Sequence, residues 1–172
     1  MGGRCHGPAM VSKRLGRDAG GRRKFLAVVD ETPECARAAA YAARRAKASG
    51  GAAVLLYVID GADFQQWLGV GEIMRAEATE EAETRLSRVA DEIRLAVGLE
   101  PETLVREGKT VDEIRDLIEA DREIAILVLA ASDSTEGPGP LVSAVAGSGS
   151  AFPIPVTIVP ATLSDEEIQS LC

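Results

Sequence analysis

Short apolar runs alternate with amphipathic segments along the chain from residue 24 onward. Continuous runs at Phe25–Val29, Ala53–Ile59 and Ile124–Ala130 predict strands covered on both faces, because a half-exposed strand would alternate apolar and polar residues. The most apolar run, Ile124–Ala130, is the candidate for the central strand. Thr103–Glu107 predicts a more polar strand near an edge. Val156–Val159, which prolines bracket, predicts a fifth strand.

The segments between these runs have the 3.6-residue period of amphipathic helices. Thr32 followed by a proline is typical of an N-cap and a first helical residue. Thr110 with Glu113 is typical of a capping box. The predicted helices are Pro33–Ser49, Glu72–Val97, Thr110–Ala120, Leu141–Ala151 and a short last helix that Ser164 and Glu167 cap.

Strict alternation of strands and helices predicts one α/β fold. Five parallel strands joined by right-handed crossovers form an open, doubly wound sheet with helices on both faces. Ligands of such sheets bind beyond the carboxyl ends of the strands. The loops after Val29, Ile59 and Ala130 are therefore where function is expected.

Charge is distributed unevenly along the 172 residues. The net charge is -8, yet residues 1–24 hold seven of the 19 basic residues and one of the 27 acidic ones. The remaining body is acidic and should repel nucleic acid. We expect a flexible basic arm at residues 1–23, one domain at 24–160, and a short C-terminal helix and tail at 161–172.

Neither a membrane span nor a metal site is expected. The longest apolar stretch, Ile124–Ala131, is far shorter than the roughly 18–20 residues that cross a bilayer. The three cysteines, Cys5, Cys35 and Cys172, have no metal-like spacing. Such cysteine usage favours the reducing cytoplasm. Cys35 is expected to be a small buried residue, although a position near a helix start could also activate its thiol.

The ends of the predicted strands resemble those of the universal stress protein family. The residues that carry the resemblance are Val28-Val29-Asp30, Leu56-Tyr57-Val58-Ile59-Asp60, Glu107-Gly108, Leu127-Val128-Leu129-Ala130 and Pro155-Val156-Thr157-Ile158-Val159, in this order. The resemblance covers residues 24–160. It implies a Rossmann-like, adenine-nucleotide-binding sheet of strand order 3-2-1-4-5. It also implies a homodimer through the last strand, here Val156, Thr157, Ile158 and Val159.

The family's ATP-binding members carry Gly-x2-Gly-x9-Gly-Ser/Thr after the fourth strand, where backbone N–H groups hold the phosphates. Here Ala130, Asp133 and Ser143 occupy the three glycine positions, unless a loop longer by four residues brings Gly147 and Ser148 into the third place. An aspartate among phosphate oxygens costs on the order of 1 kcal/mol at surface dielectric. The altered motif argues against a triphosphate.

Three other features of the sequence can each be interpreted in two ways. By the resemblance Asp30 contacts the base or ribose, but it could instead satisfy N–H groups of the next helix. Val58 would offer backbone groups to adenine, while its side chain is expected in the core. Glu136–Pro140 is either a ligand loop or a rigid turn. The candidate nucleotide-binding residues are Asp30, Thr32, Val58, Ala130, Ser132, Gly137, Gly139, Gly147 and Ser148.

The leading functional hypothesis is a non-enzymatic stress-response or regulatory protein that acts as a homodimer. No set of nucleophile, base and orienting residue is recognisable, and no metal ligand is expected. The alternative is an adenine-nucleotide-binding switch or weak ATPase with ATP or AMP as its ligand. A response-regulator receiver is disfavoured because Glu107-Gly108-Lys109 stands where a phospho-acceptor Asp would end the third strand.

Overall fold

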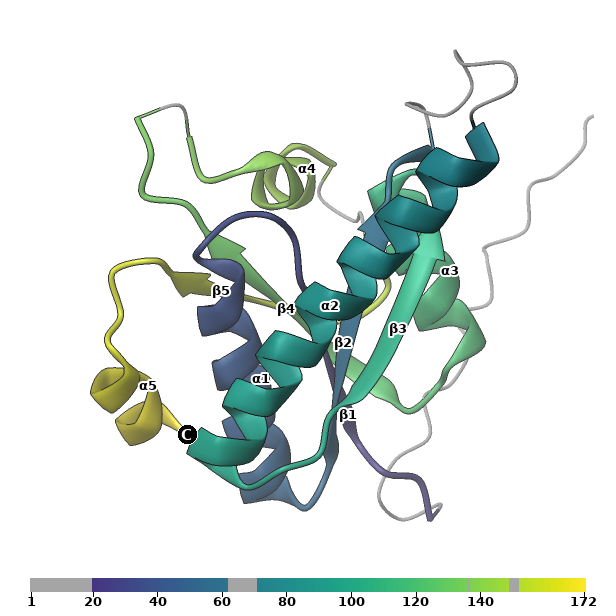
Figure 1. Cartoon of the computed structure of the whole chain (residues 1–172). Helices are drawn as coiled ribbons and strands as arrows, with labels where there is room; N and C mark the ends of the chain where they lie inside the picture. Colours follow the sequence, from purple (N-terminus) through teal and green to yellow (C-terminus); the bar gives the residue numbers. More distant parts are fainter. Residues whose placement is uncertain (1–19, 62–70, 136, 149–151) are drawn as a thin grey trace, which may run out of the picture.

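A five-stranded parallel sheet forms the centre of the computed structural model, which describes residues 20–61, 71–135, 137–148 and 152–172 (Figure 1). The strand order is β3-β2-β1-β4-β5, as predicted. The strands are β1 (Lys24–Val28), β2 (Ala52–Ile59), β3 (Glu102–Glu107), β4 (Ile124–Ala131) and β5 (Val156–Pro160). The helices are α1 (Cys35–Ser49), α2 (Gly71–Val97), α3 (Thr110–Ala120), α4 (Pro140–Ser148) and α5 (Asp165–Leu171). β1, not β4, lies in the middle, because the chain winds outward from β1 in both directions.

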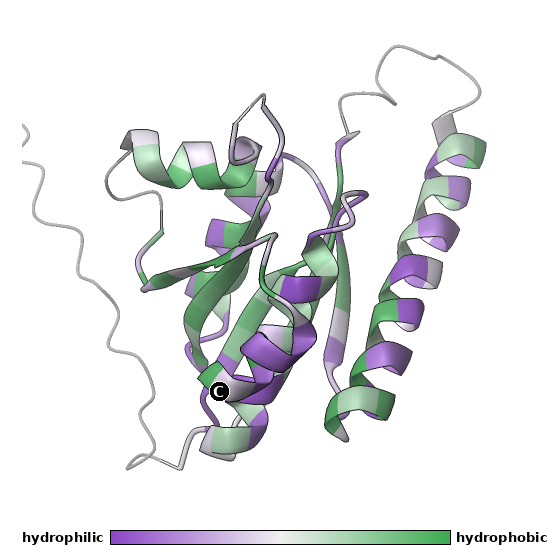
Figure 2. Ribbon diagram, turned by 90° about the vertical axis from the view of Figure 1, so that its left-hand side faces the viewer, coloured by the Kyte–Doolittle hydropathy of each residue, from purple (hydrophilic) through white to green (hydrophobic). Residues whose placement is uncertain are grey.

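Helices cover both faces of the sheet. α1, α2 and α5 pack on one face, and α3 and α4 pack on the other. Figure 2 shows the hydrophobic strands between them and the hydrophilic residues of α2. α1 buries almost only small side chains, which lets its backbone approach the sheet closely; they are Cys35, Ala38, Ala39, Ala42, Ala43 and Ala46. No helix in the described part of the chain is both long and apolar enough to cross a membrane.

The start of α1 differs from the prediction. The helix begins at Cys35, and Glu34 takes the N-cap position without a side-chain hydrogen bond. Thr32 donates its hydroxyl to Asp30 Oδ1 instead of capping the helix. Thr32 and Pro33 therefore form the turn before the helix, because a neighbouring carboxylate competes for the threonine.

The predicted capping box of α3 is also wrong. Lys109 is the N-cap, Thr110 is already helical, and no side-chain cap bond forms. Glu113 Oε2 lies 3.5 Å from Arg106 Nη1 on β3. Because Glu113 pairs with Arg106 on another element, its side chain does not form the cap that the local sequence predicted. The second predicted capping box, between Ser164 and Glu167, is confirmed in α5.

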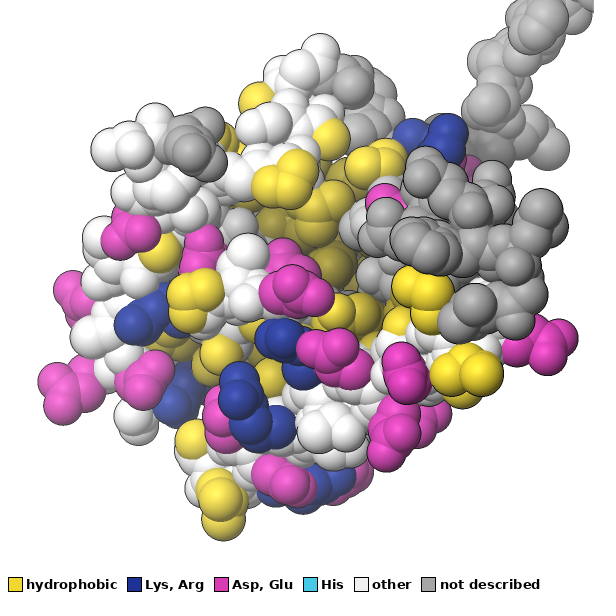
Figure 3. All heavy atoms as spheres, turned by 45° about the horizontal axis from the view of Figure 1, so that its top comes forward, with side chains coloured by type: hydrophobic (Ala, Val, Ile, Leu, Met, Phe, Trp, Pro, Cys, Tyr) yellow, Lys and Arg dark blue, Asp and Glu magenta, His cyan; other side chains and the backbone are white. Residues whose placement is uncertain are grey.

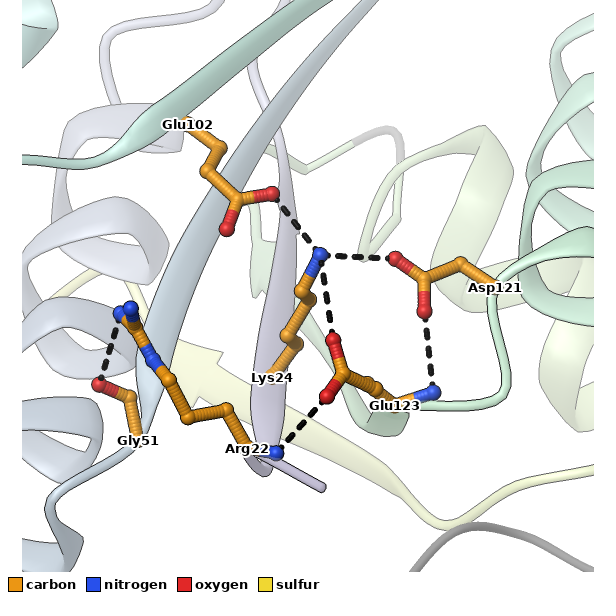
Figure 4. Close-up of polar contacts among 6 residues, drawn as sticks. All are labelled: Arg22, Lys24, Gly51, Glu102, Asp121 and Glu123. Atoms are coloured by element: carbon orange, nitrogen blue, oxygen red, sulfur yellow. Dashed lines mark hydrogen bonds and ion pairs between the residues drawn. The ribbon is translucent and has the colours of Figure 1, made fainter. Parts of the chain in front are cut away.

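An ion cluster joins the amino ends of the strands (Figure 4). Lys24 Nζ lies 2.9 Å from both Glu102 and Asp121 and 3.6 Å from Glu123. Partial burial acts to lower the pKa of Lys24, but hydrogen bonds to Asp121 and Glu102 outweigh it and raise that pKa above its ordinary value. The Arg22 backbone N–H donates to Glu123 Oε1. Arg22, which the sequence assigns to the arm, is thus in contact with the domain.

Candidate functional site

A pocket of about 410 Å³ lies at the carboxyl edge of the sheet, between the ends of β1 and β4. From this edge β1 leads to α1 on one face and β4 leads to α4 on the other, so the pocket sits where the winding reverses. Val28, Leu129 and Val142 contribute apolar lining. Figure 3 looks onto this edge and shows a hollow with an apolar floor.

Asp30 stands at the end of β1 on the rim of the pocket. Its Oδ1 accepts two hydrogen bonds from Thr32, at 2.8 Å from the backbone N–H and 2.5 Å from the hydroxyl. No donor of the described part of the chain bonds to Oδ2. Thr32 therefore orients an exposed carboxylate whose second oxygen has no hydrogen-bond partner among the described residues.

The loop between β4 and α4 is closed by its own hydrogen bonds. The Ser132 N–H donates to the Pro138 carbonyl at 3.2 Å, and the Gly137 N–H donates to the Ser134 carbonyl at 3.2 Å. The Ser134 N–H donates to Ser132 Oγ at 3.2 Å. Three of the N–H groups that could hold phosphate oxygens are thus already engaged within the loop.

Further backbone donors lie at the start of α4. Pro138 and Pro140 have no N–H, whereas Leu141 and Val142, in the first helical turn, line the pocket. Gly139 adopts φ +97°, a conformation that residues with a side chain rarely adopt. No Lys or Arg is among the described residues that line the pocket. The described lining thus offers backbone donors at the start of α4 and no cationic side chain.

The pocket brings together most of the predicted site. Its lining includes Asp30, Thr32, Ala130, Ser132, Gly137 and Gly139. Val58 instead borders a separate hollow beside α2, and its side chain packs against the core, as expected. Gly147 lies in the last turn of α4, away from the lining, and the side chain of Ser148 is outside the described residues. Sequence reasoning missed Leu141 and Val142, although Pro140 already marked the first turn of α4.

Cys35 also lines the pocket, at the first residue of α1. It is 7% exposed. Its thiol donates to the Asp30 carbonyl oxygen at 3.6 Å. Burial raises the pKa of the Cys35 thiol. The thiol is therefore protonated at neutral pH, and the prediction of a small buried residue is confirmed.

Comparison with protein families identifies the domain. The sequence profile described as "Universal stress protein family" matches residues 21–160. The chain belongs to this family. None of the curated proteins compared with the chain matches it.

Solved structures of universal stress proteins share the fold. UspA from Lactobacillus plantarum is 18% identical with a TM-score of 0.64, and the match covers 81% of this chain and 98% of that one. The Archaeoglobus fulgidus universal stress protein, in complex with dAMP, is 18% identical with a TM-score of 0.58, covering 80% and 96%. An Arabidopsis thaliana family protein with AMP bound is 17% identical with a TM-score of 0.55, covering 84% and 94%.

In this universal stress domain the three residues at the glycine positions of the ATP-binding motif, Ala130, Asp133 and Ser143, do not all line the pocket. Ala130 lines the pocket as the penultimate residue of β4, and Ser143 lines it from α4. Asp133 is exposed and is not part of the lining. The methyl group of Ala130 therefore occupies the strand end, while the Asp133 carboxylate faces solvent in the loop after β4. Within the described residues, no group of three or more potential ligands could hold a metal ion.

Proposed function

We propose that this chain is a cytoplasmic, non-enzymatic regulatory protein of the universal stress type, and that it binds adenosine or AMP in the pocket between β1 and β4. The oriented carboxylate of Asp30 is the observation that carries the proposal. Its free Oδ2 can accept hydrogen bonds from ribose hydroxyls, and the apolar lining around Val28 and Leu129 suits a purine ring. Two family structures contain adenine mononucleotides, which is consistent with a ligand of this size.

The part of the pocket at the start of α4 suits a ligand with at most one phosphate. One phosphate can accept from the Leu141 and Val142 N–H groups at the start of α4. Further phosphates would meet a loop in which three N–H groups are already engaged and which carries the exposed Asp133, with no Lys or Arg in the described lining to offset their charge. The pocket thus supports nucleoside or monophosphate recognition better than ATP hydrolysis.

Titration calorimetry with adenosine, AMP and ATP, without divalent metal, tests this function. We expect adenosine and AMP to bind with affinities at least equal to that of ATP, because each added phosphate brings repulsion and few donors. Affinity that rises steeply with phosphate number would favour the ATP-binding switch or weak ATPase. The absence of binding by all three would leave the pocket without a nucleotide role.

We also propose that the protein acts as a homodimer through β5. β5 pairs with β4 on one side, and as an edge strand it leaves backbone groups unpaired on the other. Ile158 on this strand is 43% exposed, so a second copy that pairs at this edge would cover an apolar side chain. Two edges that pair across a two-fold axis would cover both features.

A further inference from the structure

A second acidic residue, Glu34, lines the pocket between β1 and β4 together with Asp30. Glu34 is the N-cap residue of α1, but its side chain makes no capping hydrogen bond. Within the described part of the chain, no hydrogen bond or ion pair engages the Glu34 carboxylate. The proposed ribose contact of Asp30 thus leaves a second, unpaired carboxylate at the pocket.

Hydrogen bonds close the turn that joins these two residues. The Cys35 N–H donates to the Thr32 carbonyl at 3.4 Å, and the Cys35 thiol donates to the Asp30 carbonyl at 3.6 Å. The Arg37 N–H donates to the Glu34 carbonyl at 3.0 Å. The turn therefore holds Asp30, at the end of β1, and Glu34, at the start of α1, on the same side of the pocket, so both charges act on whatever occupies it.

Two helix N-termini supply the opposing positive potential. α1 begins at Cys35 and α4 begins at Pro140, and both residues line the pocket. One helix N-terminus acts as roughly half a positive charge, so the two together offset about one of the two carboxylates. No Lys or Arg belongs to the described lining. The pocket therefore keeps a net negative potential.

Two arginines of α2 lie across the turn, in a neighbouring hollow of about 200 Å³. Arg85 Nη2 lies 3.4 Å from Glu81 Oε1, and Arg88 Nε lies 3.8 Å from Glu92 Oε1. Glu31 lines the same hollow and adds a further negative charge to it. Because the charges of both arginines are offset there, they do not neutralise the two carboxylates of the pocket.

We propose that the pocket prefers an adenosine derivative with a positively charged 5′ substituent, an ammonium or sulfonium group, to adenosine itself and to AMP. The inference rests on the proposed function, because it takes the ribose to be held by Asp30. The 5′ substituent of that ribose lies in the same pocket, where the Glu34 carboxylate attracts a cation and repels a phosphate. Glu34 is thus the residue that sets the preferred charge of the ligand.

Titration calorimetry of the full chain at pH 7 with 5′-amino-5′-deoxyadenosine, adenosine and AMP tests this preference. The primary amine is protonated at this pH, as a lysine side chain is. We expect it to bind about fivefold more tightly than adenosine and about tenfold more tightly than AMP. In 1 M salt, where the screening length is about 3 Å, the preference over adenosine should fall below about twofold.

Glu34→Gln removes the charge and keeps the size of the side chain. It should lower the ratio of the two affinities, 5′-amino-5′-deoxyadenosine over adenosine, to less than about twofold. Asp133→Asn is the matched control, because Asp133 is an exposed carboxylate in the loop after β4 that does not line the pocket. It should keep the ratio of the wild type.

The outcomes separate this inference from the proposed function. If adenosine binds but the amine has no advantage over it, or if the advantage survives Glu34→Gln or 1 M salt, the inference is wrong and the proposed function stands. If none of the three ligands binds, the proposed function is wrong and the inference fails with it.

Discussion

At the scale of single residues, the proposed contact with a ribose rests on Asp30. Thr32 engages Oδ1 and leaves Oδ2 to a ligand. Asp30→Ala should therefore weaken adenosine binding about 10- to 150-fold, since a hydrogen bond to a charged group contributes about 1.5–3 kcal/mol. The affinity for 2′,3′-dideoxyadenosine, which lacks both hydroxyls, should be unchanged. Calorimetry with the two nucleosides measures the difference.

Asp133→Ala is the matched control at this scale, because Asp133 is an exposed carboxylate after β4 that does not line the pocket. It should leave the affinities for both nucleosides unchanged. If Asp30→Ala reduces the binding of both nucleosides equally, Asp30 only holds the turn before α1 and makes no contact with the ribose.

At the scale of elements, the two edge strands differ in what they offer a second copy. β5 and β3 each expose one large apolar side chain, Ile158 at 43% and Leu104 at 38%. β3 also carries Glu102, Arg106 and Glu107, and such charges discourage edge pairing. We expect sedimentation to show a dimer for the wild type and for Leu104→Arg, and a monomer for Ile158→Arg. A dimer that survives Ile158→Arg and dissociates with Leu104→Arg would place the interface on β3.

At the scale of the whole molecule, the two edges of the sheet carry different features. The carboxyl edge holds the pocket, and the amino edge holds Lys24 with its three carboxylates. Lys24→Met should lower the free energy of unfolding by about 1–2 kcal/mol, because it removes charge-assisted bonds from a side chain only 14% exposed. Adenosine affinity should not change. Denaturant unfolding and calorimetry test the two statements, with the exposed Lys109→Met as control.

The Lys24 contribution should depend on pH in a defined direction. Its folded pKa is raised above the value of the unfolded chain, about 10.4. The stabilisation is therefore fully present below that pH and is lost as the pH rises toward the folded value. The stability difference between wild type and Lys24→Met should be constant near neutral pH and shrink above about pH 10.4. A difference that grows with alkaline pH would contradict this assignment.

The sequence by itself determined the elements and the layers. Apolar runs and the 3.6-residue period predicted every strand and helix that the structure describes, because burial on both faces of a parallel sheet leaves a strong local pattern. The loops at strand ends also marked where a ligand pocket would lie. Such features depend on neighbours in sequence and on the general geometry of α/β sheets.

Only the tertiary structure determined to which of several possible partners a side chain bonds. Glu113 pairs with Arg106 on another element, so the capping box expected for α3 does not form. The cap expected from Thr32 is lost to a nearer competitor, Asp30, two residues before it. A cavity of about 250 Å³ likewise exists only where α1, α2 and the start of α5 meet. Local patterns list the bonds a side chain can make, but three-dimensional packing selects one when distant residues compete for it.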